Sequence, residues 1–321
     1  MLMTILVAVA LVGGGTLLLL RGADWFTDGA TDLARELGVS TLLVGIVLAG
    51  LEPEEMLTAA IASGRGAAGI ALGDIIGTNV TIVLAALGLA AWLTPLIIHP
   101  AVRRQAVIAT LASVPPIIAL YLGFIPRWVG VLLLALFVGY TLLLVRVDHQ
   151  ALARQTAAEQ LEQDDEDADA PAPSRRTLLT LTVGGLVAMA AGGPLIVEGA
   201  LRFTTALGLR QSAVGLTIVA LGTAAEMFAL AVAAARRHQA DILVGGIIGS
   251  FAYNLLVTLG LAAVVRPLPV APQFLQVGVP VMIAAHLVLL GLVFRGRMGR
   301  VTGALLMGGY GVYLVAVVVH G

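Results

Sequence analysis

Long uninterrupted apolar runs, rather than an alternation of apolar and polar positions, dominate this chain. About 20 consecutive apolar residues in a helix cross a hydrocarbon core of about 30 Å, and most runs here approach or exceed that length. The pattern therefore predicts an all-α polytopic membrane protein with ten transmembrane helices. These spans are expected at about residues 2–20, 40–63, 70–98, 106–124, 128–145, 178–197, 212–235, 242–265, 277–294 and 302–320.

Composition agrees with a protein that lives in the bilayer. Hydrophobic residues make up 59% of the chain and charged residues 12%, and the mean hydropathy of +1.02 lies far outside the range of water-soluble domains. The absence of cysteine excludes disulfides and thiolate metal sites. The first run lacks a positive flank and is too long for a cleaved signal, so it is interpreted as a retained span.

Basic residues predict the orientation. All 18 are arginines, and cytoplasmic loops carry an excess of positive charge. With the N-terminus outside, 13 arginines fall on the cytoplasmic side and 5 outside. The chain is thus expected in the cell membrane with both termini extracellular.

One long polar stretch, residues 146–176, separates two sets of five spans. Its run of acidic residues followed by prolines is typical of a solvated linker. A regulatory calcium sensor is the alternative, but the glycine turn and ligand spacing of an EF-hand loop are missing. The predicted units are residues 1–145, the cytoplasmic linker 146–176 and residues 177–321.

The two units are related by an internal repeat. Residues 70–78 align without gaps on residues 242–250, an offset of 172 that also carries Gly50 onto Gly222 and Glu54 onto Glu226. Because each unit has an odd number of spans, the second copy is expected to be inverted relative to the first. Inverted repeats are typical of transporters, whose substrate site lies near the bilayer midplane between interrupted helices.

Acidic residues occupy the middle of equivalent spans in both copies. Glu52, Glu54 and Glu55 flank Pro53 in the first, and Glu226 follows a Gly-Thr pair in the second. An ionised carboxylate at that depth costs at least about 2.5 kcal/mol. The alternative to ion binding is that each glutamate is protonated or hydrogen-bonded in the bundle. Two acids at symmetry-related positions beside helix breakers favour one shared site.

Calcium is the cation that suits such a site. It takes six to eight oxygen ligands, and two carboxylates neutralise one divalent ion. No histidine lies near either motif, which disfavours transition metals. The candidate ligands are carboxylate, hydroxyl, amide and backbone oxygens of Glu52, Glu54, Glu55, Glu226, Thr78, Thr223, Ser250, Asn79, Asn254, Gly50 and Gly222.

Other interpretations of these motifs remain open. Gly73-x-x-x-Gly77 and its repeat mate also suit close helix packing, and the role of Asp74, whose mate is Gly246, is undecided. The sequence lacks H-E-x-x-H and G-x-S-x-G, and His286 is interpreted as a hydrogen-bonding group of the bundle, so an enzyme is not expected. A cation channel that uses the same acids is a further alternative.

Over nearly its whole length the chain resembles the calcium:cation antiporter superfamily, which includes sodium/calcium and calcium/proton exchangers. The segments that carry the resemblance are residues 222–226, Gly-Thr-Ala-Ala-Glu, and residues 245–250, Gly-Gly-Ile-Ile-Gly-Ser. The first copy departs from the family pattern because it lacks the hydroxyl pair before its glutamates, so Glu52 or Glu55 is an alternative to Glu54 as the ligand.

The resemblance implies an antiporter that works by alternating access. Glu54 and Glu226 would bind the transported Ca²⁺, while Thr78, Thr223 and Ser250 would complete its shell, and the first and sixth spans would slide as a gate. The exchanged ion would be Na⁺, or alternatively H⁺. Apart from these ions and membrane lipid, no cofactor and no nucleic-acid partner are expected.

Overall fold

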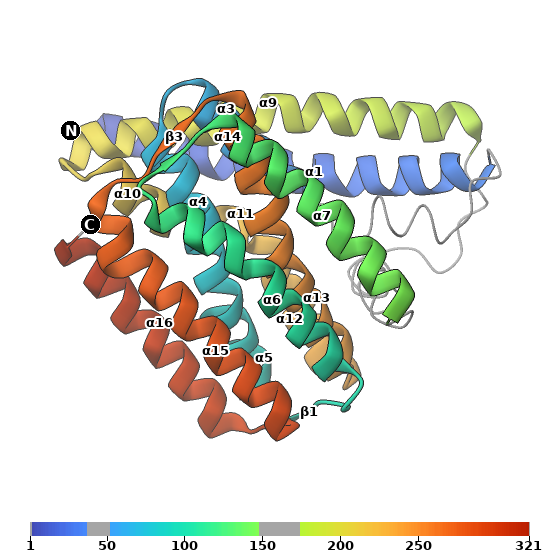
Figure 1. Cartoon of the computed structure of the whole chain (residues 1–321). Helices are drawn as coiled ribbons and strands as arrows, with labels where there is room; N and C mark the ends of the chain where they lie inside the picture. The colour runs from blue at the N-terminus through green and yellow to red at the C-terminus, as the bar shows by residue number, and fades with distance from the viewer. Residues whose placement is uncertain (1, 37–51, 148–173, 321) are drawn as a thin grey trace.

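Helices long and apolar enough to cross a membrane make up most of the computed structural model, which describes residues 2–36, 52–147 and 174–320 (Figure 1). Within these residues eight single helices qualify as spans, and a bent pair raises the number to nine. The prediction of a helical, polytopic membrane protein is confirmed. Half of the predicted span 40–63 and most of the linker 146–176 lie outside the described residues.

The helices follow one another with short connections. In the first part of the chain they are α1 (Leu2–Glu36), α3 (Pro53–Gly64), α4 (Ala68–Thr81), the π-helical η1 (Ile82–Ala86), α5 (Leu87–Leu93), α6 (Val102–Tyr121) and α7 (Arg127–Val147). In the second part they are α9 (Arg175–Leu207), α10 (Gln211–Val214), η2 (Gly215–Val219), α11 (Ala220–Thr223), α12 (Ala225–Arg237), α13 (Ala240–Tyr253), η3 (Asn254–Thr258), α14 (Leu259–Val265), η4 (Phe274–Gly278), α15 (Val279–Arg295) and α16 (Arg300–His320).

The repeat found in the sequence recurs in the element boundaries. The segments α4, η1 and α5 begin and end 172 residues before α13, η3 and α14, including the wider π-helical turn between them. A π-helical turn is rare and local. Its recurrence at the same place in both copies therefore extends the sequence repeat to the backbone.

Four short strands show how the copies are arranged. β1 (Leu96–Ile97) pairs with β4 (Arg297–Met298), and β2 (Phe124–Ile125) pairs with β3 (Leu268–Pro269). β1 and β3 are repeat mates, yet Figure 1 places them at opposite ends of the molecule. That placement is what an inverted second copy requires.

The two longest helices, α1 and α9, lie side by side and cross the other spans in Figure 1. Glycines permit their close approach: a Cβ on Gly22 would lie 2.9 Å from the Gly185 carbonyl oxygen, and one on Gly192 would lie 2.8 Å from the Gly15 carbonyl oxygen. Small residues at such crossings let helix backbones approach closely, which is the usual packing mode in lipid.

α4 and α13 form the centre of the bundle. The most apolar 18-residue windows of the spans that contain them are 100% and 89% buried, whereas the corresponding windows of the other single spans are 22–39% buried. Gly73 and Gly77 of α4 face the backbone of η2, since added Cβ atoms would lie 2.7 Å from Gly215 Cα and 2.6 Å from the Leu216 carbonyl oxygen. The packing role expected for this glycine pair is confirmed.

Several predicted span limits were wrong, for two physical reasons. Helix α9 extends well beyond the predicted 178–197 because polar residues outside the hydrocarbon remain helical. The predicted span 70–98 ends instead at Leu93, because Thr94 turns the chain into extended backbone before Pro95. The span predicted at 212–235 is bent by 46° between Thr223 and Ala225.

We expect Gly77→Ala to destabilise the fold by about 1–3 kcal/mol, because the new methyl group would overlap the backbone of η2. The measurement is thermal unfolding of the purified chain in detergent. Gly184→Ala is the matched control, since no atom lies within 4 Å of a Cβ at that helical glycine. Equal melting temperatures for the two variants would contradict the packing described here.

Candidate ion-binding site

The acids of the first copy lie where a helix begins. Glu52 precedes α3, Pro53 is its first residue, and Glu54 and Glu55 follow in its first turn. Proline suits this position because its missing N–H is not needed there, and carboxylates at a helix N-terminus are favoured by the helix dipole. Glu52, Glu54 and Glu55 are 5%, 0% and 3% exposed, so the helix start is inside the protein.

The acid of the second copy lies at an equivalent helix start. α11 ends at Thr223, Ala224 has ψ of 3°, and α12 begins at Ala225 with Glu226 in its first turn. The 46° bend at this point confirms the interruption expected beside Glu226. The two copies therefore present their acids in the same way, each at the N-terminus of a helix.

These two helix starts meet. The side chains of Glu54 and Glu226 lie close enough to interact, and Glu54 is also near Glu52. Glu52 in turn accepts a 3.4 Å hydrogen bond from the Asn254 amide, and Ser250 lies beside it. Residues from α3, α12, α13 and η3 thus converge, although they are separated by up to about 200 residues in the sequence.

A second set of polar groups adjoins this cluster on α4. The Thr223 hydroxyl donates to Asp74 Oδ1 over 2.8 Å and lies 3.1 Å from the Thr78 hydroxyl. Asp74 is 1% exposed and interacts with Glu55. Asp74 and Thr78 are four residues apart on one face of α4, so the helix aims both at the break before Glu226.

Several buried oxygens in the cluster have no hydrogen-bond partner among the described residues. They are both Oε atoms of Glu54, Oε2 of Glu55, Oδ2 of Asp74 and Oδ1 of Asn254. Buried polar atoms are normally satisfied, and an unpaired buried carboxylate is costly. Among the described residues, no arginine or histidine pairs with Glu54, Glu55 or Asp74. These carboxylate oxygens therefore lack a positive partner, and a bound cation could supply one.

Carboxylates alone do not enclose such a cation. Among the described residues, no three histidine, aspartate or glutamate side chains have ligating atoms that converge on one point. Oxygen ligation of calcium needs six or more donors, so hydroxyl, amide and backbone oxygens would have to contribute. Thr78, Thr223, Ser250 and Asn254 supply such groups beside the acids.

Not every candidate ligand joins the cluster. Asn79 directs its amide toward Met282 of α15, at 3.8 Å from the sulfur. Gly222 is near α1, since a Cβ on it would lie 2.9 Å from the Thr16 hydroxyl. Gly50 lies outside the described residues. His286 forms a 2.7 Å hydrogen bond with Thr110, which confirms its expected role within the bundle.

Sequence reasoning left the role of Asp74 undecided and did not identify Tyr253. The Tyr253 hydroxyl donates to the Met56 sulfur over 3.5 Å and lies near the three first-copy glutamates. Asp74 was detectable as an acid in an apolar span four residues before Thr78. Tyr253 carries no such signal, because a tyrosine next to an asparagine is common in any helix.

A family model described as "Sodium/calcium exchanger protein" matches residues 7–146 and 177–319. The chain is 31% identical over 315 residues to the Escherichia coli K12 inner membrane protein YrbG, with 96% of each chain covered. It is 29% identical over 309 residues to the putative antiporter CaxA of Alkalimonas amylolytica, covering 94% of this chain and 96% of CaxA.

The fold is also similar to a solved structure of the sodium-calcium exchanger NCX_Mj soaked with Na⁺ and Sr²⁺. The TM-score is 0.62 at 26% sequence identity, with 97% of this chain and 99% of that chain covered. The similarity spans the whole bundle and therefore includes the region where the acids meet.

We expect Thr223→Val to destabilise the protein by about 1–3 kcal/mol, because it would remove the hydrogen bond that satisfies Asp74 Oδ1 in the core. Thr223→Ser keeps the hydroxyl and is the matched control. Thermal unfolding in detergent measures both. A Thr223→Val variant as stable as Thr223→Ser would show that the Asp74 carboxyl does not depend on this hydroxyl.

Proposed function

The chain belongs to the sodium/calcium exchanger protein family, and from this premise we propose that it is a secondary active antiporter that exchanges Ca²⁺ for Na⁺ across a membrane. The single observation that carries the proposal is the meeting of Glu54 and Glu226 at the starts of α3 and α12, one from each copy. Their two negative charges balance one divalent cation. No cofactor is needed beyond the transported ions.

The proposed architecture is ten spans in two inverted sets of five. The boundaries repeated at 172 residues and the opposite placement of β1 and β3 support it. In such a design the substrate site lies near the bilayer midplane, where the copies meet. In this proposal the acids at the starts of α3 and α12 form that site.

Electrostatics would couple the two ions. Two unpaired carboxylates in a closed, dry site cost several kcal/mol each, so the empty carrier would rarely change its open side. A bound Ca²⁺, or a set of monovalent cations, removes that cost, so the loaded carrier can close on one side of the membrane and open on the other.

Exchange of Ca²⁺ for H⁺ is the second candidate, and the number of acids favours it. Glu52, Glu55 and Asp74 adjoin Glu54 and Glu226, and these five acids exceed the two charges of one calcium ion. Protons on the surplus carboxylates would reduce their repulsion. The family description and the likeness to NCX_Mj support Na⁺ as the first choice.

We expect Glu54→Gln and Glu226→Gln each to reduce Ca²⁺ uptake into reconstituted vesicles to the level of protein-free vesicles. Each change removes one of the two charges that balance Ca²⁺. Glu198→Gln is the matched control, because Glu198 pairs with Arg65 and Arg202 away from the acids. Full Ca²⁺ uptake by the Glu226→Gln variant would show that this glutamate is not part of the ion site.

The same vesicles distinguish the coupling ions. Uptake driven by an outward Na⁺ gradient at equal pH supports Na⁺ exchange, whereas uptake driven only by a pH gradient supports H⁺ exchange. A cation channel would instead carry Ca²⁺ with neither gradient.

Both termini are proposed to be extracellular, following the arginine distribution. Because the chain has no cysteine, single cysteines introduced at Thr4 and at Val318 can report the orientation without background. We expect both to react with a membrane-impermeant maleimide on intact cells, while Arg236→Cys reacts only after permeabilisation. If Arg236→Cys alone were labelled on intact cells, the orientation would be the opposite of the one proposed.

A further inference from the structure

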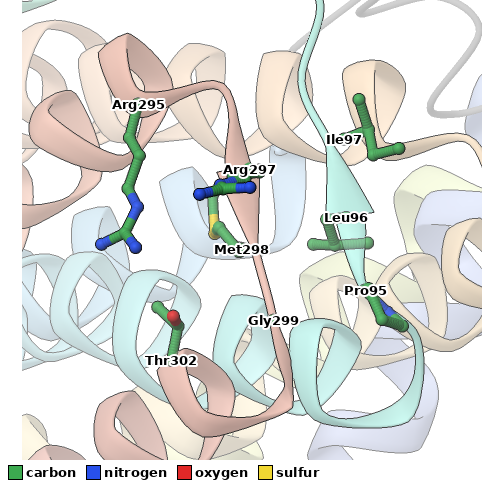
Figure 2. A pocket seen from close by; sticks show the side chains of 8 residues that line it. All are labelled: Pro95, Leu96, Ile97, Arg295, Arg297, Met298, Gly299 and Thr302. Carbon is green, nitrogen blue, oxygen red and sulfur yellow. The ribbon is translucent and has the colours of Figure 1, made fainter.

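A cleft lies at the end of three spans, away from the acidic cluster. It has a volume of about 350 Å³ and is formed by the β1 strand, the turn between α15 and α16, and the start of α16. The residues that line it are Pro95, Leu96, Ile97, Arg295, Arg297, Met298, Gly299 and Thr302 (Figure 2). Figure 2 shows the Arg295 guanidinium extending toward Thr302.

The two arginines are available to a ligand. Arg295 and Arg297 are exposed, and neither arginine forms an ion pair with another residue that the structure describes. The nearby acid Asp241 accepts a hydrogen bond from the His99 backbone N–H. The cleft therefore combines two positive charges with the Thr302 hydroxyl, a set that suits phosphate oxygens.

The other end of the molecule provides an internal comparison. The β2–β3 pair is the repeat mate of the β1–β4 pair, but Leu122 and Phe124 stand where the cleft has Arg295 and Arg297. Val129 stands in place of Thr302. The polar residues that line the cleft thus have apolar mates at the other end, although that end carries Arg127 and Arg266 on its own surface. Arg295 and Arg297 are therefore not required by the fold of the turn.

Apolar surface adjoins the cleft on the side of the bilayer. Trp92, Phe294 and Val301 are 51%, 50% and 75% exposed, and they flank the spans whose ends form the cleft. Tryptophan is enriched at membrane interfaces, and arginine near a span end reaches the headgroup layer. A ligand with an anionic head and acyl chains would contact both the arginines of the cleft and the apolar surface beside it. A free phosphate would contact only the arginines.

We propose that this cleft binds the phosphate headgroup of an anionic phospholipid, held by Arg295, Arg297 and Thr302, with its acyl chains along Trp92 and Phe294. The site is independent of the ion-exchange function proposed above. The residues that line the cleft include none of the candidate ion ligands that the structure describes. A basic cluster that serves only to orient the protein in the membrane would show no such lipid preference.

Tryptophan quenching by brominated lipid tests the proposal on the full chain in vesicles. Trp92 lies beside the cleft and Trp128 beside its apolar counterpart, and the chain has three tryptophans in all. A variant with Trp25→Phe and Trp128→Phe retains Trp92 as the reporter, and one with Trp25→Phe and Trp92→Phe retains Trp128. Brominated phosphatidylglycerol is compared with brominated phosphatidylcholine in each.

We expect phosphatidylglycerol to quench Trp92 preferentially and to show no preference at Trp128. Replacing Arg295 and Arg297 by glutamine in the Trp92 reporter should weaken the preference by about fivefold per arginine. The matched control replaces Arg175 and Arg176, which are also exposed and on the same predicted side of the membrane. It should leave the preference unchanged.

Three results would overturn the proposal. One is equal quenching of Trp92 by the two lipids, and another is an equal loss of preference in both arginine double variants, which would indicate only general surface charge. The third is a combination of two results: calorimetry shows that the protein in phosphatidylcholine vesicles binds inorganic phosphate, and Trp92 shows no preferential quenching by brominated phosphatidylglycerol. That outcome would assign the cleft to a soluble phosphate.

Discussion

The structure depends on one constraint, which is the cost of placing several carboxylates together inside a membrane protein. Glu52, Glu54 and Glu55 are buried, and an unpaired charge at that depth is unfavourable by several kcal/mol. The helix starts of α3 and α12 reduce this cost for the glutamates, because backbone N–H groups and the helix dipole favour negative charge there. The remaining charge requires cations or protons, and this requirement is the basis of the ion exchange proposed above.

Much of the fold could be predicted from the sequence because hydrophobic length is set by the bilayer. The spans at 106–124, 242–265 and 277–294 were placed within a few residues of α6, the α13–α14 segment and the η4–α15 segment. The repeat was equally visible, since its offset of 172 residues recurs in the boundaries of α4 and α13. The limits of the helices were less predictable, because hydropathy marks where hydrocarbon ends and not where helical hydrogen bonding ends.

Within the candidate site, the sequence identified most of the residues that meet, including some that the repeat does not duplicate, namely Glu52, Glu55, Thr223 and Asn254. Glu54 and Glu226 were found as a pair, and the structure brings their side chains together. Asp74 has glycine as its mate, so symmetry gave it no role, and only packing shows it bonded to Thr223. The direction of Asn79 toward Met282 was likewise unpredictable, because it depends on which neighbour α4 meets on each face. Whether these oxygens bind an ion remains a prediction.

Departures from the repeat indicate where the two copies have different tasks. A transporter with inverted copies gains two equivalent access routes from symmetry, but its two membrane faces meet different solutions and different lipids. Asp74 without a counterpart breaks the symmetry at the candidate ion site. Arg295 and Arg297, whose repeat mates are Leu122 and Phe124, break it at the surface. The shared backbone explains how both ends fold alike, so the unmatched side chains carry the information about what each copy binds. A comparison of repeat mates is therefore a direct way to separate residues that maintain this architecture from residues that make the two copies function differently.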